Sequence, residues 1–220
     1  MTENSIDAVV LVGGKGTRLR PLTVSTPKPM LPTAGVPFLM HLLARIKAAG
    51  IEHVVLSTSF KAEVFEDYFG TGESLGLDIE YVVEDEALGT GGGIRNVYDR
   101  LRGDTTMVFN GDVLGGTDLT GILQAHEANN ADVTLHLVQV GNPRAFGCVP
   151  TDATGRVLAF LEKTEDPPTN QINAGCYVFR RELIAAHQKI AAAGRWVPAT
   201  KSAHNIPLSE PELIAEQIMN

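Results

Sequence analysis

Apolar residues along this chain fall into short continuous runs that alternate with amphipathic segments. The runs that indicate buried strands lie at 7–12, 53–58, 78–84, 105–109 and 132–140. Segments with the three- and four-residue apolar spacing typical of helices lie at 37–49, 61–69, 94–101 and 119–129. Such alternation predicts an α/β fold of three layers, in which a mostly parallel sheet carries helices on both faces.

The pattern changes after residue 140. Strand-like pieces at 147–150, 156–163 and 173–179 are separated by a turn-rich stretch at 165–171. This indicates a smaller mixed or antiparallel subregion, suited to covering a second substrate. From residue 192 the chain is polar with scattered prolines, and a short helix is expected there at 210–219.

The composition fits one globular domain that binds a small anion. The 220 residues carry a formal net charge of −8, which argues against a general nucleic-acid or anionic-membrane surface. Nine carboxylates against one lysine make residues 61–86 an acidic, solvated face. The first 30 residues instead contain Lys15, Arg18, Arg20 and Lys28 against two carboxylates. A positive pocket in an acidic protein suits a small anionic ligand better than a polymer.

Cysteine, histidine and leader signals favour a cytoplasmic protein without a zinc site. Cys148 and Cys176 lie in apolar surroundings without Cys-x-x-Cys spacing, which predicts buried, reduced thiols. No two of the six histidines share ligand spacing. The first residues are polar and acidic, unlike a signal peptide, and no apolar run approaches the roughly 18 residues of a membrane helix. A homo-oligomer is left open.

A glycine-rich run follows the first strand. Residues 13–23 read Gly-Gly-Lys-Gly-Thr-Arg-Leu-Arg-Pro-Leu-Thr, and Pro27-Lys28-Pro29 comes shortly after. Without Cβ atoms the backbone can turn its N–H groups onto phosphate oxygens, and the neighbouring cations neutralise charge. Neither the phosphate loop of kinases and GTPases nor the dinucleotide fingerprint has this spacing. The run predicts a polyphosphate cradle, with a plain turn as the alternative.

This run resembles the signature of the sugar-1-phosphate nucleotidyltransferases, Gly-x-Gly-Thr-Arg-Leu-x-Pro-Leu-Thr followed by Pro-Lys-Pro. The resemblance extends over about residues 6–184. It implies the Rossmann-like nucleotide-diphospho-sugar transferase fold. We expect one domain at 1–191, with a nucleotide half at about 6–140 and a sugar-phosphate half at about 141–191. An atypical tail would follow at 192–220.

A second glycine cluster, at 89–93, lies between a predicted strand and a predicted helix. Free N–H groups at a helix N-terminus and a backbone without side chains allow a flat group to approach closely. A flexible connector is the alternative interpretation. In the family this loop holds the nucleobase. The residues that the resemblance assigns to nucleotide binding are Leu11, Gly13, Gly14, Gly16, Thr17, Arg18, Glu84, Gly89 and Thr90.

The strand at 105–109 stops at Asn110-Gly111-Asp112. A carboxylate there suits Mg²⁺, which prefers few protein oxygens together with phosphate oxygens and water. Taken alone, an aspartate after Asn-Gly is more often a turn residue. The match to the Gly-Asp of the family makes Asp112 the predicted metal ligand, and because it follows a strand we expect it to share one crevice with both glycine clusters.

The sugar-phosphate assignments come from the second half of the chain. By resemblance, the Gly147 backbone reaches the sugar, Glu162 accepts hydrogen bonds from its hydroxyls and Lys163 meets its phosphate. Asn173 begins the family's Asn-x-Gly-x-Tyr stretch, which lines the sugar pocket. An exposed ion pair is the alternative interpretation of Glu162 and Lys163.

Within the family, 88–92 and 162–168 look most like mannose-1-phosphate guanylyltransferases. This implies Mg²⁺-dependent transfer from GTP to mannose 1-phosphate, giving GDP-mannose and pyrophosphate. Two alternatives stay open: a UTP- or dTTP-dependent enzyme of the same fold, and a non-catalytic nucleotide-binding homologue or inactive fragment. The second arises because 194–200 has Pro198 where the family has a second metal-binding aspartate. The predicted catalytic residues are Arg18, Lys28, Asp112 and Lys163.

Overall fold

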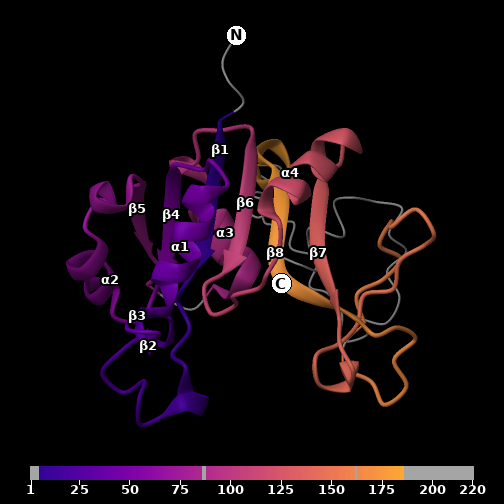
Figure 1. Ribbon diagram of the computed structural model, residues 1–220, viewed down its shortest axis with the longest axis horizontal. Helices are drawn as coiled ribbons and strands as arrows, with labels where there is room; N and C mark the ends of the chain where they lie inside the picture. Colours follow the sequence, from indigo (N-terminus) through magenta and orange to yellow (C-terminus); the bar gives the residue numbers. More distant parts are fainter. Residues whose placement is uncertain (1–4, 86–87, 162, 186–220) are drawn as a thin grey trace.

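The computed structural model describes residues 5–85, 88–161 and 163–185. Its centre is a six-stranded sheet in the order β5-β4-β1-β6-β8-β7 (Figure 1). The strands are β1 (Ile6–Leu11), β4 (His53–Thr58), β5 (Asp78–Val83), β6 (Thr105–Asn110), β7 (Val133–Gln139) and β8 (Gln171–Arg180). A separate two-stranded antiparallel pair, β2 (Pro32–Thr33) and β3 (Val36–Pro37), was not predicted.

Strand directions confirm the mostly parallel sheet. β5, β4, β1 and β6 run parallel to one another, whereas β8 is antiparallel to both β6 and β7. The parallel strands therefore end at one edge, the lower edge in Figure 1. Two segments extend below that edge in Figure 1: the chain that follows β1 at the left, and the chain between β7 and β8 at the right. Ligands of open α/β sheets bind at this edge.

Helices cover both faces of the sheet, as the three-layer prediction requires. They are α1 (Phe38–Ala48), α2 (Ala62–Phe69), α3 (Gly89–Asn96) and α4 (Leu119–Ala128). Side chains of α1, α2 and α4 share one apolar cluster, whereas α3 packs in a second cluster on the opposite face. Short 3₁₀ turns occur at η1 (Thr17–Leu19), η2 (Lys28–Met30), η3 (Glu73–Leu75), η4 (Tyr98–Arg100) and η5 (Pro143–Ala145).

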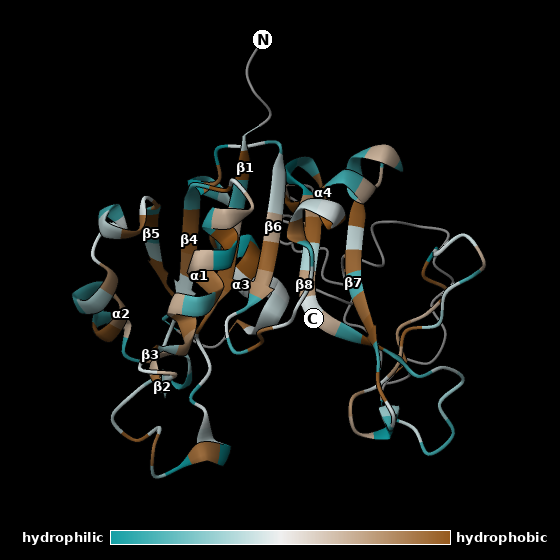
Figure 2. Cartoon of the chain, in the orientation of Figure 1, coloured by the Kyte–Doolittle hydropathy of each residue, from teal (hydrophilic) through white to brown (hydrophobic). Residues whose placement is uncertain are grey.

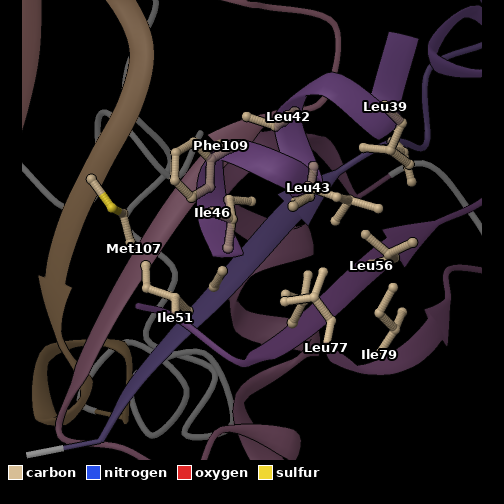
Figure 3. Close-up of a cluster of buried hydrophobic side chains, with 14 of the residues drawn as sticks. Leu39, Leu42, Leu43, Ile46, Ile51, Leu56, Leu77, Ile79, Met107 and Phe109 are labelled. Atoms are coloured by element: carbon tan, nitrogen blue, oxygen red, sulfur yellow. The ribbon is translucent and has the colours of Figure 1, made fainter. Parts of the chain in front are cut away.

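The larger apolar cluster follows from the periodicity of α1. Leu39, Leu42, Leu43 and Ile46 recur three and four positions apart and are all buried. Figure 3 shows them directed toward side chains of the sheet, among them Leu56. Figure 2 shows the corresponding pattern of apolar strands and helices with polar outer faces. Burial of such side chains, at about 25 cal/mol per Å² of apolar surface, holds the layers together.

Two predicted boundaries near the second glycine cluster are wrong. The helix expected at 94–101 begins at Gly89 and ends at Asn96, and residues 98–100 form the separate turn η4. Glycine disfavours a helix interior, so its low propensity argued for a loop. Packing overrides that preference here, because Gly91, Gly92 and Gly93 are buried against the sheet.

The strand-like pieces at 147–150 and 156–163 are likewise not strands. In the described part of this segment they form isolated antiparallel bridges, Cys148 with Leu161 and Thr151 with Val157, and the Leu158 N–H donates 2.9 Å to the Pro150 carbonyl. The third piece, expected at 173–179, is the centre of β8. The tail and the helix expected at 210–219 lie outside the described residues.

Both cysteines are buried and free, which confirms that expectation. Among the described residues, no helix is long and apolar enough to cross a membrane.

A network of buried hydrogen bonds around Asp7 links the amino ends of β1, β4 and β6. Asp7 is 1% exposed, and its Oδ1 lies 2.7 Å from His53 Nδ1. Its Oδ2 accepts hydrogen bonds of 2.7 Å from the backbone N–H groups of Arg102 and Gly103. Burial by itself would raise the pKa of Asp7, but the hydrogen bonds from His53, Gly103 and Arg102 outweigh it, so the pKa lies below its usual value.

Replacing Asp7 with asparagine is expected to lower the free energy of unfolding by about 3 kcal/mol, because the buried hydrogen bonds from His53, Arg102 and Gly103 lose their charged acceptor. The folded-state pKa of Asp7 is depressed, so its stabilisation is present above the unfolded pKa, near 3.8, and is lost as pH falls through the folded value. Urea titrations of both proteins at pH 7 and at pH 3 measure the effect, and the difference should shrink at pH 3.

Asp78→Asn is the control, because Asp78 pairs with Arg102 on the surface, where side chains are about half exposed. It should cost less than about 1 kcal/mol. An Asp7→Asn penalty that stayed constant between the two pH values would contradict the assignment.

Candidate active site

A cavity of about 730 Å³ opens at the carboxyl ends of the parallel strands. It is formed by the loop after β1, by η1 and η2, by the junction of β5 and α3 and by the end of β6. Its lining residues are Leu11, Val12, Gly13, Gly14, Gly16, Thr17, Arg18, Leu19, Lys28, Pro29, Ser59, Glu84, Gly89, Thr90, Asn110 and Asp112. The two glycine clusters and Asp112 therefore share one crevice, as predicted. Every residue predicted for nucleotide binding lines it.

The first glycine run forms a tight, pinned loop. Gly16 has a φ of +56°, a conformation that favours glycine, and η1 begins directly after it. The Thr23 hydroxyl donates a 2.7 Å hydrogen bond to the Gly16 carbonyl, and Thr23 is 1% exposed. This contact closes the loop at its base. The Arg18 side chain, in η1, is exposed and lines the cavity.

Lys28 and Asp112 meet across the cavity. Lys28 begins η2, between Pro27 and Pro29, and its Nζ donates a 2.7 Å hydrogen bond to Asp112 Oδ2. The two side chains are 38% and 45% exposed, so the pair faces the opening of the cavity. An exposed pair of this kind adds only about 0–1 kcal/mol to stability. Its position indicates a chemical role more than a structural one.

The second glycine cluster is the first turn of α3 rather than a loop. A Cβ on Gly93 would lie 2.8 Å from Glu84 Oε1, 3.2 Å from Ser57 Oγ and 3.3 Å from a Leu11 methyl carbon. A side chain at this position would therefore displace the Glu84 carboxylate. Gly89 and Thr90, at the exposed N-terminus of α3, line the cavity.

Gly93→Ala is expected to destabilise the fold by about 2 kcal/mol, because the added methyl group overpacks the contact between α3 and the sheet. Thermal or urea unfolding measures the effect. Gly116→Ala is the matched control: nothing lies within 4 Å of its added Cβ, and its change should stay within about 0.5 kcal/mol. Equal effects of the two substitutions would show that the close approach is unimportant.

Three polar residues in or next to the cavity wall were not predicted from the sequence. Asn110 and Ser59 line the cavity, and the Ser59 hydroxyl hydrogen-bonds to the Gly13 carbonyl. Ser57 lies behind the cavity and donates a 2.8 Å hydrogen bond to Glu84 Oε1. The available signal was their place at or just after strand ends, which at a parallel sheet is where ligands bind.

The described sugar-phosphate residues, Gly147, Lys163 and Asn173, lie outside the lining of this cavity. Gly147 has a φ of +77°, Lys163 is exposed, and Glu162 lies outside the described residues. Asn173 uses both ends of its amide locally: Nδ2 donates 2.6 Å to the Tyr177 hydroxyl, and Oδ1 accepts 3.0 Å from the Gly175 N–H. Gly175 in turn lies close against Asn110 of the cavity. Asn173 is thus connected to the cavity through its neighbours.

The metal-binding capacity of the cavity is limited to few protein ligands. Within the described part of the chain no three His, Cys, Asp or Glu side chains cluster to hold an ion. Asp112 nevertheless offers a carboxylate in a cavity also lined by Arg18 and Lys28. This fits Mg²⁺, which keeps several waters and binds through one or two carboxylates plus the phosphates of a ligand.

Comparison with known proteins agrees with this geometry. The chain is 71% identical over 184 residues to mannose-1-phosphate guanylyltransferase of Mycobacterium tuberculosis, covering 84% of this chain and 51% of that protein. It is 37% identical over 179 residues to D-glycero-alpha-D-manno-heptose 1-phosphate guanylyltransferase of Aneurinibacillus thermoaerophilus, covering 81% and 76%. The chain therefore spans about half the length of the mycobacterial relative.

Solved structures share the fold. HddC from Yersinia pseudotuberculosis in complex with GMP-PN superposes with a TM-score of 0.70 at 30% identity, over 81% of this chain and 78% of that chain. A putative glucose-1-phosphate thymidylyltransferase from Bacillus anthracis has a TM-score of 0.79 at 22% identity, over 87% and 79%. The family model described as nucleotidyl transferase matches residues 7–207. With its fold, its cavity and this match, the chain belongs to the nucleotidyl transferase family.

Proposed function

We propose that this chain transfers a guanylyl group from GTP to mannose 1-phosphate, giving GDP-mannose and pyrophosphate. The observation that carries the proposal is the cavity in which Arg18, Lys28 and Asp112 meet beside a glycine loop. The 71% identity to a mannose-1-phosphate guanylyltransferase supports the choice of base and sugar. The bound GMP-PN named for the Yersinia relative supports a guanine nucleotide.

The cavity has a cationic part and an acidic part. Arg18 and Lys28 lie with the first glycine loop, and Glu84, Gly89 and Thr90 lie at the junction of β5 and α3. Triphosphate oxygens suit the first part, where backbone N–H groups and cations are available. We assign the base to the second part, against the backbone of Gly89 and the carboxylate of Glu84.

In the proposed reaction an oxygen of the sugar phosphate attacks the α-phosphorus of GTP. The bond between the α-phosphorus and the bridging oxygen breaks, and pyrophosphate leaves with the electron pair. The nucleophile is already an anion, so no general base and no covalent protein intermediate are needed. Arg18 and Lys28 offset the charge on the phosphates, and Lys163 positions the sugar phosphate. Positioning and charge stabilisation carry the catalysis.

Asp112 is the residue that would hold Mg²⁺ in this chain. When bound, the ion supplies charge neutralisation on the phosphate oxygens. We place the sugar phosphate toward the segment that contains Gly147, Glu162, Lys163 and Asn173. This proposal follows the residue assignments of the family, and Gly147, Lys163 and Asn173 lie outside the lining of the nucleotide cavity.

Pyrophosphate release tests the proposal. GTP, ATP, UTP, CTP and dTTP are each combined with mannose 1-phosphate and with glucose 1-phosphate in the presence of Mg²⁺. Fastest release from GTP and mannose 1-phosphate is the expected result. Preference for UTP or dTTP would assign the chain to another member of the fold. Calorimetric binding of GTP without product over hours would favour a non-catalytic nucleotide-binding protein.

A further inference from the structure

The carboxylate of Glu84 is held from behind by a buried hydroxyl. Ser57, near the end of β4, is 1% exposed, and its Oγ donates a 2.8 Å hydrogen bond to Glu84 Oε1. The other oxygen, Oε2, accepts a 3.2 Å hydrogen bond from the backbone N–H of Leu88, at the start of α3. The backbone N–H of Glu84 itself donates 2.7 Å to the Thr58 carbonyl. Two hydrogen bonds, one from β4 and one from the start of α3, therefore fix this side chain, and a backbone hydrogen bond to β4 fixes its Cα.

The packing of α3 brings the helix backbone against this pair. Gly93 approaches Glu84 Oε1 and Ser57 Oγ so closely that a Cβ would lie 2.8 Å and 3.2 Å from them. Helix, serine and carboxylate are thus in mutual contact behind the wall of the cavity. The Ser57 hydroxyl and the Leu88 N–H thus occupy the protein side of the Glu84 carboxylate, while Glu84 itself lines the cavity.

The negative charge of Glu84 would repel a triphosphate, so the presence of this carboxylate in the cavity requires an explanation. None of the described lysine, arginine or histidine side chains lies within ion-pair distance of Glu84. An ionised carboxylate only accepts hydrogen bonds, at about four lone-pair sites, and the protein contacts fill two of them. The remaining sites call for donors on the ligand.

Among the nucleobases, guanine alone presents two adjacent donors, its ring N1–H and its exocyclic N2 amine. Uracil and thymine present one N–H between two carbonyl acceptors. Adenine places an acceptor beside its amine, and so does cytosine. An acceptor-only carboxylate that is prevented from rotating therefore matches guanine and leaves other bases with an acceptor facing an acceptor.

We propose that Ser57 is a positioning residue for base selection: its hydroxyl orients the Glu84 carboxylate so that the free lone pairs meet the two adjacent donors of guanine. The proposal rests on the proposed function, which assigns the base to the Glu84 part of the cavity. It adds Ser57 as the residue that holds the Glu84 carboxylate in one orientation. Ser57 acts through Glu84 and does not line the cavity itself.

The test measures nucleotide binding rather than turnover. Kd values for GTP and UTP are obtained by calorimetry with Mg²⁺ for the unchanged chain and for Ser57→Ala. Loss of the hydroxyl frees the carboxylate to rotate, so the Kd for GTP should rise about tenfold, the effect of one hydrogen bond to a charged group. The Kd for UTP should change less than about twofold, since UTP does not use the second acceptor. The GTP-to-UTP ratio of affinities, which is the Kd for UTP divided by the Kd for GTP, should therefore fall.

Thr58→Val is the matched control. Thr58 is the next residue of the same strand, is fully buried, and directs its hydroxyl to the Val82 carbonyl at 3.4 Å, away from Glu84. Its substitution removes a buried hydroxyl of similar size and should leave the GTP-to-UTP ratio unchanged. A second variant, Glu84→Gln, should lower the ratio further, and adding Ser57→Ala to it should change the ratio little, because both act at one carboxylate.

An unchanged GTP-to-UTP ratio in Ser57→Ala, or an equal contraction in Thr58→Val, would overturn the inference. So would a chain that binds UTP as tightly as GTP. Absence of pyrophosphate release in the presence of selective GTP binding would instead overturn the proposed transfer reaction and leave the role of Ser57 supported. The binding and turnover measurements therefore separate the two proposals.

Discussion

Replacing Asp112 with asparagine is expected to lower the rate of pyrophosphate release about a thousandfold, because a neutral amide is a poor ligand for Mg²⁺ and the charge on the reacting phosphates is left uncompensated. The exposed pair with Lys28 contributes little to the fold, so the free energy of unfolding should change by less than about 1 kcal/mol. Steady-state kinetics at several Mg²⁺ concentrations, together with thermal unfolding, measure both effects.

Asp99→Asn is the control for loss of one negative charge. Asp99 is an exposed residue of η4 and does not line the cavity, so its substitution should leave the rate unchanged. A rate within tenfold of the unchanged chain for Asp112→Asn would reject Asp112 as the metal ligand. It would leave Asp112 as a partner of Lys28 only.

Arg18→Ala is expected to lower the rate about a hundredfold to a thousandfold, because a guanidinium beside the triphosphate offsets charge that grows on the leaving pyrophosphate. Arg18 forms no ion pair with any described carboxylate, so the fold should lose little stability. Single-turnover rates at saturating GTP separate the chemical step from binding.

Arg20→Ala provides the comparison. Arg20 lies two residues further along the same exposed loop, carries the same charge, and is absent from the cavity lining. General attraction of the nucleotide to a positive loop would make the two substitutions equivalent. A specific role requires a large effect at Arg18 and a small one at Arg20.

The sequence predicted that the glycine clusters and Asp112 share one crevice, because the signals for this are local. Apolar runs predict strands, and the glycine clusters that follow the strands at 7–12 and 78–84 mark where the chain leaves the sheet. Asp112 follows a strand in the same way. Because these strands are parallel, their carboxyl ends lie at one edge, and the cavity lining includes Gly13, Gly14, Gly16, Gly89 and Asp112. Two signals were sufficient to predict this convergence: ligands bind at the carboxyl ends of parallel strands, and the first glycine run matches a family signature.

The prediction was weaker where contacts between distant residues decide the structure. The glycines after Leu88 looked like a loop by propensity, yet they form a helix because Gly93 packs against Glu84 and Ser57. The antiparallel direction of β8 agrees with the mixed or antiparallel subregion expected after residue 140, but its place between β6 and β7 in the main sheet was not predicted, because it depends on where the connecting segment returns. The same limit applies to Ser57, an ordinary strand residue until its partner across the sheet is known.

The contact between Lys28 and Asp112 has a consequence for how ligands bind. Each group of the pair is the natural partner of a different ligand, an anion for Lys28 and a divalent cation for Asp112. Whichever ligand arrives first must separate the pair, and by doing so it releases the site of the other. The two affinities are therefore linked, and by thermodynamic reciprocity each ligand strengthens the binding of the other by the same factor.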